Sequence, residues 1–466
     1  MPYTCHERAV ALYDRHIFDT AVEAMGALAA LRARLAFSRR HSLRNSESGG
    51  ATQEISKPKV DFVVTVERPA AVESNNALMV TRILWYSRLS RFFGCLFISN
   101  LSGKTLKKAT ATWKSPYTVY AAFWFSMFLG YQTIALVSTS KSVDKDKTFP
   151  RYLRFVSYAV SVAKVCVNYM CFCLGSEGLL EFLRNATAFE RSTSFSPKVK
   201  RRLNLARRAF NVTVRTVLVA SFIGAFCIAV TEGMRKLPSA PLHWRLGIGA
   251  VVLGSEVAFF MYESLVHVIT TRCSEVLQRY LESELARLEA NCTTDTHYAQ
   301  LSSVSKIAMV RVNVCKIKAL KRSLDKICGP AIVASSASLL ALLCLNVYRS
   351  FTLDVHELEL WLPIVYTVYC CLCLVDMAFV SDDLAKQARK VKDAAKTVTM
   401  LYSPKEYFQQ VRYLHNTIEP EEMCFTGSNF FRLDRGLLLT VTGSVITFAV
   451  ILMQTGGDLK RRMGLQ

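Results

Sequence analysis

Seven stretches of the chain are long and apolar enough to cross a lipid bilayer. A helix needs about 20 mostly apolar residues to span the hydrocarbon core, because each residue advances it by about 1.5 Å. The stretches that meet this length lie at 116–138, 155–174, 212–230, 246–270, 330–347, 361–380 and 437–455. The pattern predicts an all-α polytopic membrane protein with seven transmembrane helices.

The loops after spans two, four and six are long, and those after spans four and six have helical patterns of their own. Apolar residues recur three and four positions apart from Ser274 to Leu288 and from Ile307 to Ile327, with Lys and Arg between them. Ala385 to Met400 continues span six in the same way. We expect cytoplasmic helical extensions, with a turn near 291–295, whose apolar faces form an anchor bundle with neighbouring subunits.

The residues before the first span divide into two parts. Residues 1–74 contain an Arg-rich patch followed by a Ser/Gly-rich stretch and no apolar core of a cleavable signal peptide, so we expect disorder there. Within 75–110, basic and apolar residues alternate from Ala77 to Ile98, which predicts a helix lying in the cytoplasmic interface of the membrane. The seven-helix domain would then occupy residues 111–466.

Composition and charge support a membrane protein rather than a nucleic-acid-binding one. Apolar residues make up 51% of the chain and the formal net charge is +22. The basic residues concentrate in the loops after spans two, four and six. The positive-inside rule therefore places the N-terminus in the cytoplasm and the C-terminus outside, although Lys460, Arg461 and Arg462 in the tail oppose this. We expect a multi-pass plasma-membrane protein that contacts the lipid bilayer and no nucleic acid.

The sequence contains no motif for catalysis, a cofactor or a metal. Many of the fifteen cysteines lie inside the predicted spans, where cysteine packs as a small apolar residue. Gly247, Gly249 and Gly254 lie within a span and follow no strand, which excludes a nucleotide-binding loop. We expect no enzyme activity, no cofactor and no metal site. Seven spans also do not divide into two equal inverted repeats, which disfavours a secondary transporter.

Ionisable side chains inside the spans are candidates for function, because a charge in hydrocarbon is costly. They are Lys164, Glu256, Glu263, His267 and Asp376. Glu256, Glu263 and His267 share one face of the fourth span, and with Lys164 they could form a ligand or ion path. The alternative is structural. Glu263 and His267 would then be solvated near the cytoplasmic end, while Glu256 would be neutral or would pair with Lys164.

The last span carries a polar stripe. At about 100° per residue, five positions fall within about 80° of one another: Thr440, Ser444, Thr447, Ile451 and Gln454. The stripe must face protein or water, because an unpaired amide or hydroxyl in hydrocarbon costs several kcal/mol. A pore would supply that water. Alternatively, the hydroxyl groups bond to their own helix and Gln454 joins two helices.

The C-terminal residues resemble the signature of arthropod gustatory receptors, which are seven-transmembrane chemoreceptors related to insect odorant receptors. The similar positions are Phe425–Asp434, Leu437–Leu439, Thr447, Phe448 and Gln454. The family's last helix carries Thr-Tyr, five apolar residues and then Gln-Phe. In this chain Phe448 replaces the Tyr and Thr455 replaces the final Phe.

The resemblance implies a gustatory chemoreceptor that acts as a ligand-gated, nonselective cation channel. It implies a homotetramer or a heterotetramer with related receptors, whose last helices line a central pore. A small-molecule tastant bound in the outer half of the bundle, among spans two to six, would open the pore. Carried over by position, Gln454 would form the filter for permeating cations, Ile451 the apolar gate and Thr447 the wall of the vestibule.

Two other classes remain open. A G-protein-coupled receptor would have the opposite orientation, which would expose triplets such as Asn185-Ala186-Thr187 to glycosylation. The chain lacks that class's Asp-Arg-Tyr-like motif after the third span and has no cysteine in a predicted outer loop. A noncatalytic membrane scaffold would differ from a channel in carrying no current.

Overall fold

The structure is a computed structural model that describes most of the chain after residue 76. It describes residues 77–462 apart from 102–105, 107–108, 112–114, 146–148, 196–211, 221–222, 225–226, 228–241, 293–298, 353–357 and 399–404. The chain forms two units, Met1–Ala70 and Ala71–Gln466, and every described residue belongs to the second. The predicted disorder of residues 1–74 lies outside the described residues.

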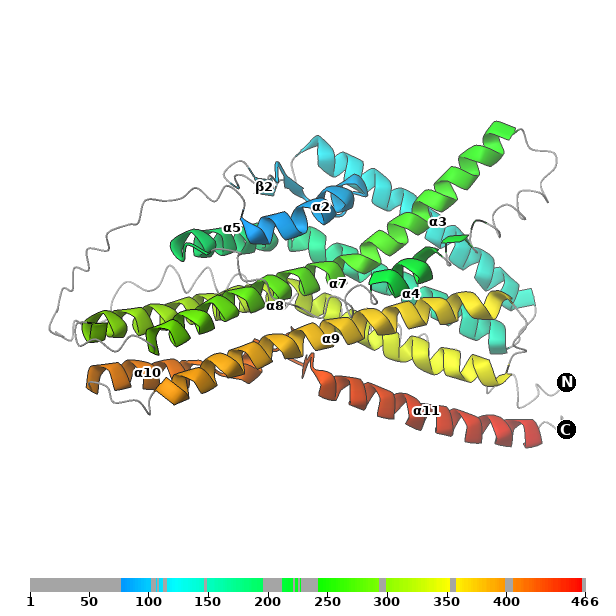
Figure 1. The fold of residues 1–466 in the computed structure, drawn as a ribbon. Helices are drawn as coiled ribbons and strands as arrows, with labels where there is room; N and C mark the ends of the chain where they lie inside the picture. Colours follow the sequence, from blue (N-terminus) through cyan, green and yellow to red (C-terminus); the bar gives the residue numbers. More distant parts are fainter. Residues whose placement is uncertain are drawn as a thin grey trace, which may run out of the picture. The chain divides into compact units, whose positions relative to one another are not determined.

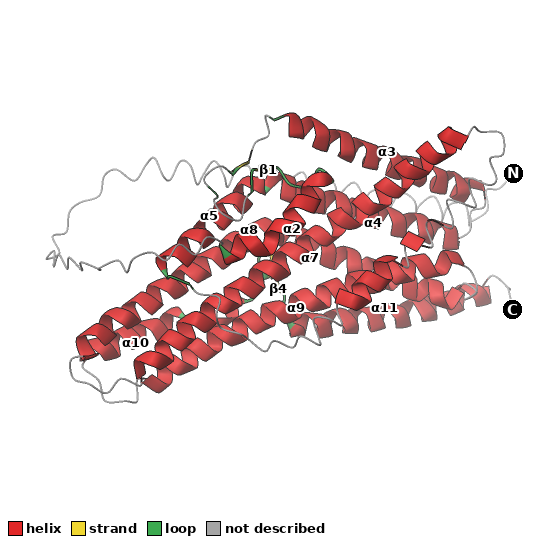
Figure 2. Ribbon diagram, turned by 45° about the horizontal axis from the view of Figure 1, so that its top comes forward, coloured by secondary structure: helices red, strands yellow, loops and turns green. Residues whose placement is uncertain are grey.

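The described part is helical apart from two short hairpins (Figure 2), which confirms the all-α prediction. The helices are α2 (Leu78–Phe92), α3 (Pro116–Lys145), α4 (Phe149–Leu174), α5 (Ser176–Ser192), α7 (Leu242–Cys292), α8 (Ala299–Thr352), α9 (Leu358–Val398), α10 (Lys405–Thr417), the 3-10 helix η1 (Pro420–Met423) and α11 (Arg435–Arg462). Residues 212–220 are also helical. The hairpins pair β1 (Ile98–Ser99) with β2 (Thr110–Ala111) and β3 (Thr426–Gly427) with β4 (Phe431–Arg432), both antiparallel.

Five helices among the described residues are long and apolar enough to cross a membrane. They cover Pro116–Lys141, Tyr152–Leu174, Gly247–Ala290, Val304–Val347 and Pro363–Thr397, and correspond to predicted spans one, two, four, five and six. The last predicted span lies within α11, where Arg435–Ile451 forms a shorter apolar helix. The third predicted span is helical over 212–220 and only partly described beyond that point.

Three of these helices continue far beyond the thickness of a bilayer. α7, α8 and α9 contain 51, 54 and 41 residues. At about 1.5 Å per residue they are about 77, 81 and 62 Å long, against a hydrocarbon core of about 30 Å. They lie side by side, and α10 packs against α8 and α9 (Figure 1). The prediction that spans four, five and six extend as helices is confirmed.

α2 packs against α5 and α7 and exposes an apolar and basic face. It ends at Phe92, earlier than the predicted Ile98, because Gly94 turns the chain with a φ of +74°. A side chain at Gly94 would lie 2.9 Å from the Cα atom of Ala121 in α3, so glycine is required at this close approach. Trp85 and Phe92 on the outer face are largely exposed. Such a face is typical of a helix in the membrane interface, and that position stays a prediction.

A carboxylate at the start of α2 fixes the helix to its neighbours. The backbone N–H groups of Leu78 and Met79 donate to the two oxygens of Glu190 in α5 at 2.8 and 3.0 Å. The Tyr280 hydroxyl of α7 donates to the same carboxylate. Burial raises the pKa of Glu190, and the hydrogen bonds from Tyr280, Met79 and Leu78 oppose that rise because they favour the charged form. A negative group is favourable here because the N-terminus of a helix is its positive end.

Candidate functional site

The predicted pore residues lie on α11, and Thr447, Ile451 and Gln454 are all exposed in the single chain. The hydroxyl groups of Thr440, Ser444 and Thr447 donate to backbone carbonyls one turn earlier, at 3.1, 2.9 and 2.9 Å. The self-bonding considered as an alternative is therefore present for these hydroxyl groups. Their oxygen lone pairs can still accept from water, so this bonding does not decide what the stripe faces.

The other faces of α11 are also exposed. Leu439, Ile446, Phe448 and Val450 have large exposed fractions, whereas Leu437 and Leu438 near its start pack against the core. Apolar faces of a membrane helix can lie against lipid, but a stripe of hydroxyl and amide groups cannot do so without cost. α11 is thus attached to the rest of the bundle chiefly at its first turns.

The run from Phe425 to Asp434 forms the β3–β4 hairpin, which precedes α11 directly (Figure 1). Ser428 and Asn429 both have positive φ, 49° and 66°, and the Phe430 N–H donates to the Gly427 carbonyl at 2.8 Å. Two successive residues with positive φ close the tight turns that suit two antiparallel strands. The residues of this run predicted a resemblance to the family signature but no secondary structure.

The hairpin is bonded to both α8 and α9. The Phe425 N–H donates to the Ser381 hydroxyl of α9 at 2.8 Å. Asp325 of α8 accepts from the N–H and the hydroxyl of Thr426 at 3.4 and 3.3 Å. Lys321 lies 2.6 Å from the Asp325 carboxylate one turn away. The hairpin therefore connects two of the long helices.

Further contacts carry this connection into α11. Asp434 accepts from the Leu437 N–H at 2.9 Å, which caps the start of the helix. Arg435 in the first turn pairs with Asp382 of α9 at 2.8 Å. Gly329 of α8 meets the turn so closely that a side chain there would lie 3.0 Å from the backbone nitrogen of Ser428. The first turn of α11 is consequently fixed to α8 and α9.

η1 adds an ionic contact just before the hairpin. Glu422 lies 2.5 Å from Lys318 and 2.9 Å from Arg322, both on α8. The hydrogen bond from Lys318 is the main cause that lowers the pKa of Glu422 to about 2. Because the groups are partly exposed to water, this contact contributes modestly to stability and serves mainly to orient η1.

Two of the predicted ionisable residues form a buried ion pair. Lys164 of α4 pairs with Glu263 of α7, and their side chains are only 2% and 5% exposed. Asn168 donates to the other oxygen of Glu263 at 3.3 Å, and the Lys164 ammonium lies 3.3 Å from the Cys370 sulfur of α9. The prediction that Lys164 pairs with Glu256 is therefore wrong. The prediction that Glu263 is solvated is also wrong.

Glu256 belongs to a different cluster. It is buried and approaches Tyr131 and Gln132 of α3. Lys164 and Glu263 are thus brought together, and Glu256 lies apart from them, so a path along all three stays a hypothesis. No group of three or more His, Cys, Asp or Glu that could hold a metal ion occurs in the part of the chain that the structure describes.

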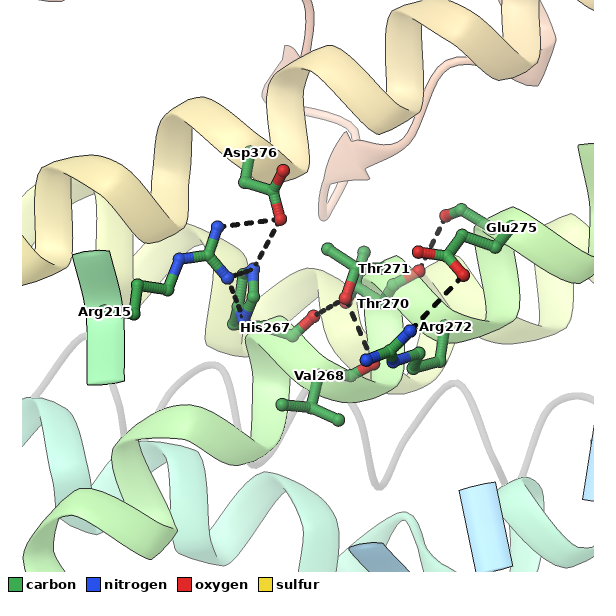
Figure 3. Close-up of polar contacts among 9 residues, drawn as sticks. Arg215, His267, Val268, Thr270, Thr271, Arg272, Glu275 and Asp376 are labelled. Atoms are coloured by element: carbon green, nitrogen blue, oxygen red, sulfur yellow. Dashed lines mark hydrogen bonds and ion pairs between the residues drawn. The ribbon is translucent and has the colours of Figure 1, made fainter. Parts of the chain in front are cut away.

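A third polar cluster borders a cavity of about 470 Å³ between segment 212–220, α7 and α9. Arg215 and His267 both contact the same oxygen of Asp376, at 2.8 and 3.0 Å (Figure 3). Arg215 also lies 2.7 Å from Nε2 of His267, and Arg272 lies 3.5 Å from Glu275 one turn further along α7. The sequence named His267 and Asp376 separately, but Arg215 was missed because it lies among the first residues of a predicted span, where a basic residue is unremarkable.

Comparison with known proteins identifies the family. The family model described as 7tm Chemosensory receptor matches residues 83–456. This chain belongs to that family. The chemosensory receptor is therefore a member of a family of multi-pass membrane receptors, and the resemblance noted in its last span is confirmed at the level of the chemoreceptor superfamily.

Solved structures show the same fold for this chemosensory receptor. It is similar to the insect olfactory receptor OR5 from Machilis hrabei in complex with eugenol, with 11% identity, a TM-score of 0.59, and 81% of this chain and 99% of that chain covered. It is also similar to a second structure of the insect olfactory receptor OR5 from Machilis hrabei, with 11% identity, a TM-score of 0.61, and 80% of this chain and 98% of that chain covered. No curated protein matches the chain.

The buried ion pair leads to a prediction about stability. In the chemosensory receptor, Lys164→Met should leave the Glu263 carboxylate buried without its cation and cost about 3–5 kcal/mol, because an unpaired buried charge is far worse than none. Replacing both residues, in Lys164→Met with Glu263→Leu, should restore most of the loss. Thermal unfolding of the purified full-length chain measures both effects. Lys316→Met, which removes an exposed Lys from α8, is the control, and a single variant as stable as wild type would contradict the prediction.

Proposed function

We propose that this chain is a subunit of a ligand-gated, nonselective cation channel of gustatory type, with four copies of α11 around a central pore. The observation that carries the proposal is the polar stripe, in which Thr440, Thr447, Ile451 and Gln454 are exposed and Ser444 is half-buried. Hydrocarbon cannot solvate such a stripe, whereas a water-filled pore between subunits can. Membership of the chemosensory receptor family supports the receptor part of the function.

Three residues of the stripe take the roles that the family resemblance implies, and their chemistry suits those roles. A ring of Gln454 amides presents neutral carbonyl oxygens, which favour cations without strong selection among them. A ring of Ile451 side chains one turn away closes the pore by excluding water, and Thr447 lines the vestibule. The ligand is a small-molecule tastant, and the tetramer contains identical or related receptors.

The extensions of the long helices provide surfaces for assembly. Met309 and Val312 on α8, with Phe408 and Tyr413 on α10, are exposed apolar side chains. Apolar faces of this kind need a partner when they lie outside a membrane. We infer that they meet the same faces of neighbouring subunits as the cytoplasmic anchor. No feature of the described residues favours the G-protein-coupled alternative.

The pore proposal predicts distinct effects for two stripe residues. Gln454→Lys should reduce cation permeability relative to chloride, because four ammonium groups would repel cations at the narrowest point, and Gln454→Ala should change the relative permeability of cations. Ile451→Ser should raise the current without ligand, because a hydroxyl ring does not exclude water. Whole-cell recording in cells with equal surface expression measures all three. Ile446→Ser, on another face of α11, is the matched control, and unchanged permeability in both Gln454 variants would contradict the filter role.

We further propose that the receptor lies in the plasma membrane with its N-terminus in the cytoplasm. The concentration of basic residues in the loops after spans two, four and six supports this orientation. An epitope tag before residue 1 should be stained only after the cells are permeabilised, and endoglycosidase should not shift the mobility of the chain. Staining of intact cells together with glycans on Asn185 would reverse the orientation.

The β3–β4 hairpin is proposed to transmit ligand binding to the pore. Its bonds to Ser381 and Asp325, and the pair between Arg435 and Asp382, make the start of α11 follow any movement of α8 and α9. A ligand that changes how the long helices pack would then reorient the starts of all four copies of α11. Bonds of this kind can carry coupling only if the hairpin moves as one unit with its anchors.

This coupling can be separated from the pore itself. Asp325→Ala and Ser381→Ala should reduce the current evoked by a tastant found in a current-based screen, while relative ion permeability stays as in wild type. When Ile451→Ser is added, the ligand-independent current should persist, because the opened gate no longer depends on the hairpin. Asp393→Ala removes an exposed carboxylate from α9 and is the control. Wild-type responses in both hairpin variants would exclude the coupling role.

A further inference from the structure

The cavity beside Arg215 and Asp376 has the dimensions of a binding site for a small molecule. Its wall on α7 follows one helical face from Ser264 to Glu275, and the six lining residues lie alternately three positions and one position apart. The twelve residues from Ser264 to Glu275 make this face about 16 Å long. The volume of about 470 Å³ lies within the range of about 300–1,000 Å³ found for small-molecule sites.

The walls change character along the cavity. Val219, Ile223 and Val268 give it an apolar part, whereas Arg272 and Glu275 lie at the end nearer the α7 extension. Under the proposed orientation, the apolar end points toward the middle of the membrane and the charged end toward the cytoplasm. An occupant with a hydrocarbon body and one polar end matches this gradient.

The charges of the walls decide the charge of the occupant. The Arg215 guanidinium is paired with Asp376, and Arg272 is paired with Glu275 (Figure 3). The two arginines and the two carboxylates that line the cavity therefore balance in number. A ligand with a net charge would therefore enter a partly buried site without a counter-charge, which is unfavourable. An uncharged ligand meets no such penalty.

Arg272 can donate a hydrogen bond to the polar end of the bound molecule. The Arg272 side chain is 40% exposed and has five N–H donors, while its pair with Glu275 occupies one edge of the guanidinium group. A hydroxyl, ether or carbonyl oxygen of the ligand can accept from the remaining donors. The O–H group of Thr216 donates to its own helix at 2.8 Å, and the hydroxyl oxygen remains an acceptor on the facing wall.

The cavity also adjoins the hairpin that holds α11. Val380 of α9 lines the cavity, and the next residue, Ser381, accepts the hydrogen bond from Phe425. Asp376 lies about one turn earlier on the same helix. A molecule that fills the cavity contacts α9 within one residue of the hairpin attachment.

We propose that this cavity binds an uncharged amphipathic small molecule, with a hydrocarbon body and one hydrogen-bonding oxygen, and that occupancy modulates the channel through α9. The site lies toward the α7 extension and is separate from the outer-half tastant site of the proposed function. The effect of the bound molecule on current rests on the proposed channel function, whereas its binding in the cavity does not.

Photolabelling of the purified full-length chain in zwitterionic nanodiscs tests the binding. The probe is an aliphatic alcohol carrying a diazirine, compared with the matching carboxylate and primary amine. The alcohol should label 212–220 and Ser264–Arg272, and the charged probes should label these peptides about tenfold less, as expected for a difference of about 1.4 kcal/mol. Equal labelling by all three probes would overturn the proposal.

Two variants examine the site and its charge balance. Val268→Trp should fill the cavity and abolish labelling by the alcohol, while Val251→Trp, at an exposed position of the same helix, should leave it unchanged. Asp376→Asn removes the negative partner of Arg215 and should shift the preference toward the carboxylate probe. Labelling that persists in Val268→Trp, or a preference unaffected by Asp376→Asn, would contradict the site.

Current recording separates this proposal from the channel proposal. If the site modulates the channel, the parent alcohol without the diazirine should change the tastant-evoked current of wild type and of Val251→Trp but not of Val268→Trp. If α11 lines no pore, Gln454 variants leave currents unaltered while the labelling pattern remains. If only the labelling fails, the cavity proposal is wrong and the channel proposal stands.

Discussion

The ion pair of Lys164 and Glu263 sets the register in which α4, α7 and α9 meet. Two charges with almost no exposure to water are tolerable only when they contact one another, so neither helix can slide or rotate without a large cost. Asn168 and Cys370 supply further contacts on α4 and α9. The positions of the cavity and of the hairpin both depend on α9, and therefore on this pair.

Much of the helical architecture could be predicted from sequence, because a membrane span is recognised by length and hydropathy alone. The extensions of spans four, five and six followed from helical spacing between Ile307 and Ile327 and in similar stretches. The partner of Lys164 could not be predicted, since three carboxylates were available within the spans and only the packing of α4 on α7 selects Glu263. The hairpin was missed because strands of two residues have no detectable period. Arg215 was missed because a basic residue among the first residues of a predicted span is unremarkable, and its partners come from two other helices.

The run that resembles a family signature divides into two parts with different physical tasks. Phe425 to Asp434 holds α11 to the bundle through backbone N–H groups and acidic side chains. Thr447 to Gln454 lies on the exposed helix beyond it. The signature therefore has two parts. The first attaches α11 to the bundle, and the second is a helix surface that is exposed in the single chain. This explains why sequence reasoning, which considered only the helix, assigned chemistry to one half of it.

The place where the hairpin meets α8 is close to the middle of that helix. Asp325 stands 26 residues after Ala299 and 27 before Thr352, and Gly329 and Pro330 follow within five residues. Proline removes a backbone hydrogen bond, so the helix is most easily bent at the same point. If α8, which is about 81 Å long, tilts by about 3° about its centre, each end moves by about 2 Å and the centre is hardly displaced. Because α11 is attached near the centre of α8, a tilt of α8 would rotate the first turn of α11 and hardly displace it.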